Sequence, residues 1–435
     1  MRSSRRIGIR GATLLALSLA IAGCGSAGHP RVKESPIGPG EIETWAGTGT
    51  QGSNGDGKGR LETWLNQPME LAFSPDGSAL LVDWNNHCVR RVTEDVVESV
   101  IGLDMPGDWP CVDPAEPTRC QVPLSGTVPG DQLALNHPMD VAFDEGGFLL
   151  AAWHDHKVMR YDDGTGDVSV LSGLMEPGPA VAPPPADGSA PPPNPPGDGG
   201  PAAKAPLNFP SSIVIQPDGG ILVSDERNNR IRRIAPDGPR TITTVAGAAP
   251  AAGTDADGVP ATKALLSLTT SEVVSGADNP PPGGAIALAD DGTLYVADTF
   301  HHAVRRIQPG ADGLVGVGDP AEELISTVAG TRGVNGYDGD GGPATAASLN
   351  QPFDVELGPD GALYVADTKN HVVRRVDLES GTIETIAGTN APGFSGDRGP
   401  AKEARLRDPY GLAFDAAGDL FIADTMNDRI RRVAR

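Results

Sequence analysis

The chain of 435 residues lacks several features that would point to a familiar class of protein. No G-x-S-x-G elbow, H-E-x-x-H zinc motif or phosphate-cradling loop is present, which argues against the corresponding hydrolases and nucleotide enzymes. Lysine and arginine are scarce, 34 against 57 acidic residues, and this balance disfavours nucleic acid as a partner. Aromatic residues reach only 4%. The 57 glycines and 41 prolines are instead typical of many short strands and turns.

Only one segment is apolar enough to suggest contact with a membrane, and it lies near the N-terminus. A run from Ala12 to Ala22 follows several arginines, which suits a secretory signal and is too short for a mature membrane helix. The run ends at Cys24, in a context that resembles the bacterial lipobox; an ordinary signal with a chance cysteine is the alternative. We therefore expect a lipoprotein signal peptide (1–23), lipidation of Cys24, a tether (24–40) and a membrane anchor in the cell envelope. By resemblance to sorting signals, Gly25 favours the outer membrane or cell surface.

The exported part of the chain is strongly acidic and contains few thiols. Removal of residues 1–23 takes away four arginines and lowers the formal net charge from −23 to −27. Such a surface suits a cation, a glycan or a basic protein surface better than it suits phosphate. Cys111 and Cys120 share one proline-rich insertion, so we expect a disulfide between them. Cys88 lies in a repeated strand and is interpreted as a buried apolar residue.

The dominant feature of the sequence is a sixfold internal repeat. Each unit contains an apolar strand, a glycine-containing turn, a second strand, a tight polar turn and a third strand. A short fourth strand follows the first five units, for example VESVIG and IETIAG. The units occupy residues 65–91, 135–160, 207–233, 279–306, 349–375 and 406–432.

Four antiparallel strands per unit predict an all-β, six-bladed β-propeller over residues 41–435, with residues 176–200 as a proline-rich loop insertion. The sixth unit ends three residues before the C-terminus and has no fourth strand of its own. A matching segment, IETWAG, begins at Ile42. We expect this N-terminal strand to complete the last blade and to close the ring.

The repeated words P-x-D-V-A, L-Y-V-A-D-T and N-H-x-V-R-R resemble those of the NHL-repeat family, and the pattern is similar to teneurin-type NHL domains. The resemblance covers roughly residues 42–435. It is specific for the fold and says little of function, because such propellers carry binding, scaffold and enzyme roles.

Several residue types recur at fixed places in the repeat, and each has a structural interpretation. The aspartate that ends the second strand is expected to cap the turn that follows it. Four histidines share one turn position with an asparagine and an aspartate, so they are interpreted as turn residues. One arginine of each Arg-Arg pair is expected to meet the strand-two aspartate or a neighbouring blade. In unit two Ala152 replaces the aspartate, so a looser turn is expected there. The aspartates are Asp83, Asp225, Asp298, Asp367 and Asp424, and the histidines are His87, His156, His302 and His371.

Two features outside these positions were considered for binding. Glu70, Asp140 and Asp354 stand near the start of the innermost strands, where three carboxylates near one axis could hold Ca²⁺. Solvated acids at a channel mouth are the alternative. The Gly- and Asp-rich connectors, such as GYDGDGG, resemble a calcium loop only faintly and are interpreted as turns.

The leading functional hypothesis is a non-catalytic, surface-anchored binding or scaffold protein that uses its connector loops and channel mouth, with a protein or glycan partner at the cell envelope. The alternative is a metal-dependent lactonase or lyase similar to gluconolactonase-like and streptogramin-lyase-like propellers, with Glu70, Asp140 and Asp354 as metal ligands and calcium as the candidate cofactor. An amidating-lyase type with channel histidines fits less well, because the histidines here follow the repeat.

Overall fold

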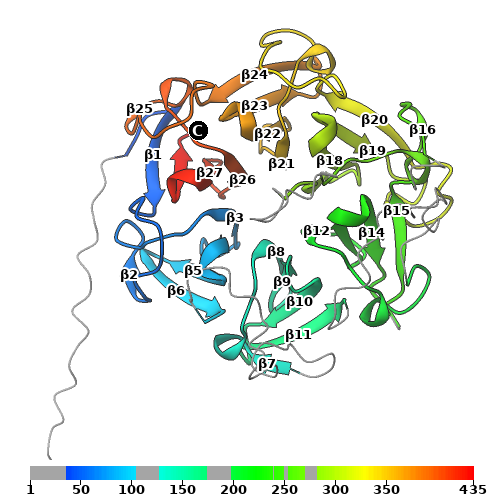
Figure 1. Cartoon of the computed structure of the whole chain (residues 1–435), viewed down its shortest axis with the longest axis horizontal. Helices are drawn as coiled ribbons and strands as arrows, with labels where there is room; N and C mark the ends of the chain where they lie inside the picture. Colours follow the sequence, from blue (N-terminus) through cyan, green and yellow to red (C-terminus); the bar gives the residue numbers. More distant parts are fainter. Residues whose placement is uncertain (1–35, 104–126, 174–196, 239, 249–252, 270–281) are drawn as a thin grey trace, which may run out of the picture. The chain divides into compact units, whose positions relative to one another are not determined.

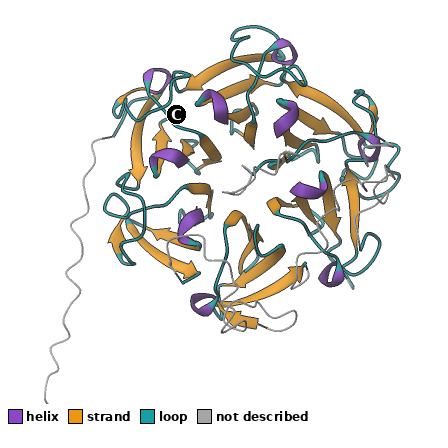
Figure 2. Ribbon diagram, in the orientation of Figure 1, coloured by secondary structure: helices purple, strands orange, loops and turns teal. Residues whose placement is uncertain are grey.

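The six repeats form six antiparallel sheets in the part of the chain that a computed structural model describes, residues 36–103, 127–173, 197–238, 240–248, 253–269 and 282–435. The sheets are the blades of a β-propeller and surround a common axis (Figure 1). Strands dominate, and the helical segments are single turns (Figure 2). The predicted fold class is confirmed. The signal segment, Cys24, Cys111, Cys120 and most of the proline-rich loop lie outside the described residues.

The first three blades follow the chain from the inside of the ring to the outside. Blade 1 contains β3 (Pro68–Phe73), β4 (Ala79–Asp83), β5 (Cys88–Thr93) and β6 (Val96–Ile101). Blade 2 contains β8 (Pro138–Asp144), β9 (Gly147–Ala152), β10 (Lys157–Asp162) and β11 (Asp167–Ser172). Blade 3 contains β12 (Pro210–Ile215), β13 (Ile221–Asp225), β14 (Arg230–Ile234) and β15 (Ile242–Ala246).

The other three blades repeat this order. Blade 4 contains β17 (Ile286–Leu288), β18 (Leu294–Asp298), β19 (Ala303–Ile307) and β20 (Leu324–Ala329). Blade 5 contains β21 (Pro352–Leu357), β22 (Leu363–Asp367), β23 (Val372–Asp377) and β24 (Thr382–Ala387). Blade 6 takes three strands from the C-terminal end of the chain, β26 (Pro409–Phe414), β27 (Leu420–Asp424) and β28 (Arg429–Val433).

The fourth strand of blade 6 comes from the other end of the chain, as predicted. Strand β1 (Glu41–Ala46) pairs antiparallel with β28, with Ile42 opposite Val433 and Ala46 opposite Ile430. A buried apolar cluster with residues such as Leu71 and Phe421 then joins blade 6 to blade 1. The ring is therefore closed by the first described strand.

The connectors add a short outermost segment to each blade, which the repeat pattern had not predicted. Each connector covers the outer edge of the blade that it leads into, so no long strand edge is left open. In blades 3 and 5 single bridges do this, Pro201 with Thr241 and Pro343 with Thr382. In the other four blades the segments are β2 (Lys58–Gly59), β7 (Thr127–Pro129), β16 (Val259–Pro260) and β25 (Gly399–Pro400).

Single turns of 3₁₀ helix occupy two recurring places in the described residues. One set lies in the connectors just before the inner strands: η2 (Gly130–Gln132), η3 (Ala202–Lys204), η5 (Ala261–Lys263), η7 (Ala344–Ala346) and η9 (Ala401–Glu403). The other set joins the second and third strands: η1 (Trp84–Asn86), η4 (Glu226–Asn228), η6 (Thr299–His301), η8 (Thr368–Asn370) and η10 (Thr425–Asn427). None of these helices is long and apolar enough to cross a membrane, nor is any other helix of the described residues.

The strand-two aspartates act over a longer range than the sequence indicated. They do not cap the turn that follows them; Asp367, for instance, accepts a backbone N–H bond of 2.7 Å from Asn350, 17 residues upstream. The same carboxylate binds the amide of Asn370 and lies 3.5 Å from the buried guanidinium of Arg374. The expected Asx-type cap is therefore wrong, because the carboxylate accepts a backbone N–H of the connector and contacts its own turn only through the side chain of Asn370.

The first arginine of each pair is buried between two aspartates, which confirms its predicted role. Arg374 is 0% exposed and also contacts the connector residue Asp340 at 2.6 Å. The same arrangement recurs in blades 1, 3, 4 and 6 of the described structure. A buried cation of this kind requires partners on both sides. The other Asp–Arg–Asp sets are Asp83–Arg90–Asp56, Asp225–Arg232–Asp198, Asp298–Arg305–Asp257 and Asp424–Arg431–Asp397.

Blade 2 has replaced this polar set by an apolar one. Ala152 stands at the aspartate position and Met159 at the arginine position, and both are buried. Asp155 takes over the backbone bond by accepting the N–H of Asn136 at 3.0 Å. The turn lacks the 3₁₀ helix of the other blades, and its closing bond from His156 to Trp153 is 3.2 Å long. His156 keeps the left-handed conformation of its counterparts, with φ of 54°, so the expected looser turn stays a prediction.

Neighbouring blades are joined by one hydrogen bond that recurs at all six boundaries. The acceptor is the turn residue before the third strand, and it lies in the left-handed region in every blade, with φ between 50° and 56°. The donor is a backbone N–H of the next blade. The acceptor–donor pairs are His87–His137, His156–Phe209, Asn229–Leu268, His302–Gln351, His371–Asp408 and Asp428–Gln67. The repeated histidines are thus structural: their backbone N–H groups close their own turns, and their side chains connect neighbouring blades.

Substitution in blade 5 tests the Asp–Arg–Asp arrangement. Arg374→Met leaves Asp367 buried without its cation, so we expect a loss of about 3–5 kcal/mol in the free energy of unfolding. The triple variant Asp367→Ala/Asn370→Asp/Arg374→Met copies blade 2 and should lose much less. Urea denaturation measures both. A triple variant as unstable as the single one would contradict this interpretation.

Candidate functional site

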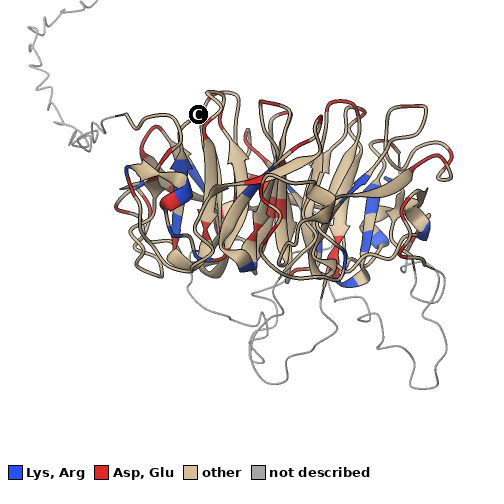
Figure 3. Cartoon of the chain, turned by 90° about the horizontal axis from the view of Figure 1, so that it is seen from above, with Lys and Arg blue, Asp and Glu red and all other residues tan. Residues whose placement is uncertain are grey.

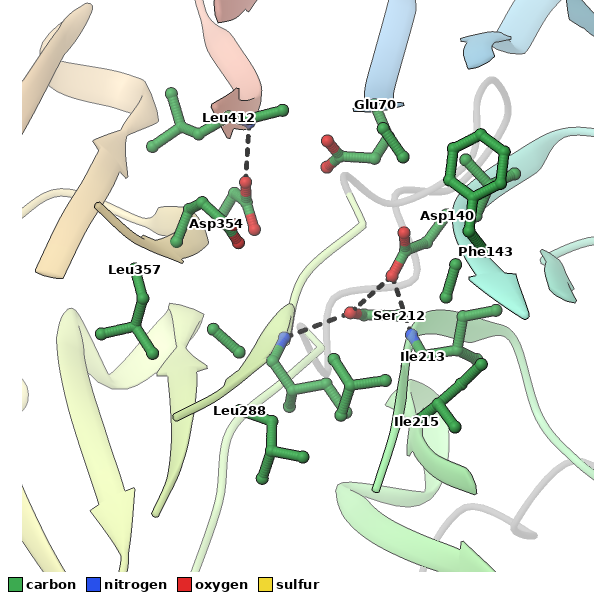
Figure 4. Close-up of a pocket in the computed structure, with 18 of the residues that line it drawn as sticks. Glu70, Asp140, Phe143, Ser212, Ile213, Ile215, Leu288, Asp354, Leu357 and Leu412 are labelled. Carbon is green, nitrogen blue, oxygen red and sulfur yellow. Dashed lines mark hydrogen bonds between the residues drawn. The ribbon is translucent and has the colours of Figure 1, made fainter. Parts of the chain in front are cut away.

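The inner strands of all six blades line one central pocket with a volume of about 600 Å³. Its residues come from β3, β8, β12, β17, β21 and β26 and from the turns that follow β12 and β17. The inner strands present their free edges and alternate side chains to this space (Figure 4). A pocket of this size falls within the usual range for sites that bind small molecules.

The pocket is blocked where the inner strands begin. The residue after each inner-strand proline is bulky and buried in four blades of the described structure; Met69, Met139, Phe353 and Tyr410 share one apolar cluster and are at most 7% exposed. The pocket lining starts one residue later and extends to Pro217 and Asp290, which are exposed. The pocket therefore opens toward the turns between first and second strands. Among the described residues, these four side chains close the end beside the connectors.

Two of the predicted acids lie in the pocket and connect neighbouring blades. Asp140 accepts 2.8 Å bonds from the hydroxyl of Ser212 and the N–H of Ile213. Asp354 accepts the N–H of Leu412 at 2.7 Å. Burial raises the pKa of Asp140 to about 6 and that of Asp354 to about 7, although these bonds act in the opposite direction. Both carboxylates accept hydrogen bonds from backbone N–H groups at the free edge of a neighbouring inner strand, where no further strand is present to accept them.

The third predicted acid and one further acid have unused oxygens. Glu70 is 9% exposed, and its Oε1 accepts only the N–H of the adjacent Leu71. Glu356 lines the pocket on the same strand face as Asp354, and no hydrogen bond or ion pair to it is found in the described residues. Burial and the charge of Asp354 raise the pKa of each glutamate well above its usual value. The alternation D-V-E in β21 could have revealed Glu356 from the sequence.

The predicted calcium set is not assembled. Figure 4 shows the carboxyl groups of Glu70, Asp140 and Asp354 facing the pocket from three blades. Within the described ranges, however, no three side chains of histidine, cysteine, aspartate or glutamate come together as metal ligands. Two of the three acids bind backbone N–H groups of neighbouring blades, Asp140 through one of its oxygens. The three acids therefore form no metal-ligand set, and of the two aspartates in GYDGDGG, Asp340 binds Arg374 while Asp338 accepts the N–H of Ser348.

The walls of the pocket are apolar between its acids and its mouth. Phe143, Ile215, Leu288 and Leu357 line it and are partly exposed. Lysine, arginine and histidine are absent from the lining as far as the structure describes it. The arrangement offers hydrogen-bond acceptors at the closed end and apolar surface above them. Among the described lining residues the one side-chain hydroxyl beside a carboxylate is that of Ser212, and it is held between blades, because it donates to Asp140 and accepts the N–H of Ile286.

Comparison with known sequences finds propeller repeats. The model of the teneurin NHL domain matches residues 270–377. Teneurin-1 of Mus musculus is 29% identical over 263 residues, which are 55% of this chain and 8% of that protein. Protein SUPPRESSOR OF QUENCHING 1, chloroplastic, of Arabidopsis thaliana is 31% identical over 156 residues, 35% of this chain and 14% of that protein. The chain thus spans a small part of these relatives.

Solved structures show the same architecture. A structural genomics protein of unknown function from Bacteroides thetaiotaomicron superposes with a TM-score of 0.57 at 15% identity, over 90% of this chain and 75% of that one. An auxiliary nutrient binding protein from Bacteroides ovatus gives a TM-score of 0.56 at 14% identity, over 90% and 76%. At these identities the likeness concerns the fold alone.

The unpaired glutamate can be tested by its effect on the pH dependence of stability. A carboxyl with a raised folded pKa binds more protons in the folded state, so its contribution to stability falls as pH rises above the unfolded pKa. We expect Glu356→Gln to raise the melting temperature at pH 8 and to leave it nearly unchanged at pH 5. Glu98→Gln, on the exposed side of β6, is the matched control. An equal shift at both pH values would contradict this assignment.

Proposed function

Because the chain is an NHL-repeat β-propeller, we propose that it is a non-catalytic binding protein of the cell envelope that holds a small organic ligand in its central pocket. One observation carries the proposal: the pocket has a blocked end with unused carboxyl oxygens and an apolar wall. In apolar surroundings water alone solvates the carboxyl groups poorly. A complementary ligand can bind the carboxyl groups and cover the apolar walls at the same time.

A binding role agrees with the descriptions of two structures that share this fold. Both are called auxiliary nutrient binding proteins, one from Bacteroides thetaiotaomicron and one from Bacteroides ovatus. The lactonase or lyase alternative needs a metal that polarises the substrate, and no observation of the described residues favours it, since no ligand set for a metal is formed there. A protein or glycan partner at the connector face is the remaining alternative.

A ligand screen by thermal shift distinguishes the pocket from the connector face. We expect ligands that raise the melting temperature of the wild-type protein to lose their effect in Ala72→Trp, since Ala72 lines the pocket. Trp64→Ser removes a 39% exposed side chain from the first connector and should leave the effect intact. The reverse pattern would move the binding site to the connectors and contradict the proposal.

We also propose export and lipid anchoring through Cys24, which rests on the sequence of residues 1–24. In a bacterial host the wild-type protein should fractionate with membranes and incorporate labelled fatty acid. Cys24→Ser should do neither, whereas Cys120→Ser should behave as wild type. A Cys24→Ser protein that stays in the membrane fraction would contradict the anchor.

A further inference from the structure

The charges around the central pocket are of one sign. Glu70, Asp140, Asp290, Asp354 and Glu356 line it, and no basic residue is among the lining residues. Elsewhere in the described structure, basic and acidic residues are both present around the ring (Figure 3), and the buried strand-two aspartates such as Asp367 have an arginine partner. Within the described part of the chain, the pocket therefore contains no cation of the protein that could pair with its carboxyl groups.

Glu70 provides the second, independent observation. Its side chain is only 9% exposed, and Figure 4 shows the carboxyl group directed into the pocket. Oε1 accepts the N–H of Leu71, while no donor of the described residues reaches Oε2. A Cβ atom at Gly411 would lie 2.7 Å from that oxygen, so the glycine leaves room for the carboxyl group. A largely buried glutamate with one unpartnered oxygen directed into a pocket is costly unless something binds to it.

The acids also repel one another across the pocket. The charges of Asp354, Asp140 and Glu356 all add to the effect of burial in raising the pKa of Glu70. A bound cation would reverse this effect, because it favours the ionised carboxylates. Binding of a cation should therefore release protons near neutral pH.

The apolar walls decide which kind of cation fits. A hydrated metal ion would leave Phe143, Ile215, Leu288 and Leu357 without a contact, and the described residues form no metal-ligand set. An ammonium group has three donors that suit carboxylate oxygens, and an apolar body would cover the walls.

We infer that the pocket binds an organic cation, a primary ammonium on an apolar body, with the ammonium at Glu70 and Glu356. This inference rests on the proposed function, because it names the ligand class for the same pocket. Charge-assisted hydrogen bonds should make such a ligand at least about tenfold tighter than its neutral analogue.

A matched series of probes tests the inference by calorimetry on the mature protein. 4-Phenylbutylamine, 4-phenylbutanol and 4-phenylbutyrate share one apolar body and differ in charge. We expect the amine to bind at about millimolar concentration or below, the alcohol at least tenfold more weakly, and the carboxylate not at all. Buffers with different ionisation enthalpies should reveal proton release with the amine.

The variant Glu70→Gln/Glu356→Gln supplies the specificity control. It should bind the amine no better than the alcohol, and unchanged alcohol binding would show that the pocket is still folded. If the alcohol binds as well as the amine in the wild-type protein, the inference fails while the proposed function stands. The inference is overturned if none of the three probes binds. It is also overturned if Ca²⁺ alone binds and the double variant abolishes Ca²⁺ binding. In either case the separate thermal-shift screen with Ala72→Trp decides the proposed function.

Discussion

Every feature of this protein depends on six sheets that must each hold their two neighbours until the ring closes. The buried apolar residues of the described chain form six clusters, and five of them each lie between two adjacent blades. The sixth lies between blades 1 and 2 and also includes Phe353 and Tyr410 at the closed end of the pocket. One backbone N–H bond to a turn residue recurs at each boundary, including the last one, where Asp428 accepts the N–H of Gln67. The pairing of β1 with β28 makes the sixth boundary equal to the other five. Loss of one boundary would open the edge that closure removes.

The same closure creates the pocket and its unbalanced charge. Six inner strands meet around one axis, so their free edges need acceptors that no further strand can supply. Asp140, Ser212 and Asp354 supply some of them across blade boundaries. Glu70 and Glu356 do not, and their burial without a cation costs stability that a binding role would explain. The buried first arginines of the Arg-Arg pairs show the contrast, because each of them has aspartates on two sides.

The sequence predicts the architecture well because the repeat is strong and local. Strand order, blade number and the closing strand all follow from counting units, and the Arg–Asp contacts follow from residues seven apart on paired strands. The role of the aspartates was misjudged, since their donor lies 17 residues upstream in a connector and no local turn rule reaches that far. Glu70, Asp140 and Asp354 were correctly grouped around the axis. The sequence spacing of these residues does not encode how neighbouring blades pack. Packing between blades decides their burial, the closed end of the channel and the unused oxygen of Glu70.

Closure by the N-terminal strand is tested most directly by a disulfide across it. Glu43 and Arg432 are opposite each other on β1 and β28, and their side chains already form an ion pair. Paired positions of this kind suit the geometry of a disulfide. In a Cys111→Ser/Cys120→Ser background, Glu43→Cys/Arg432→Cys should oxidise almost completely and raise the melting temperature, since the bond would close a loop of nearly the whole ring. Two cysteines that stay reduced under oxidising conditions in the folded protein would contradict the closure and the pocket that depends on it.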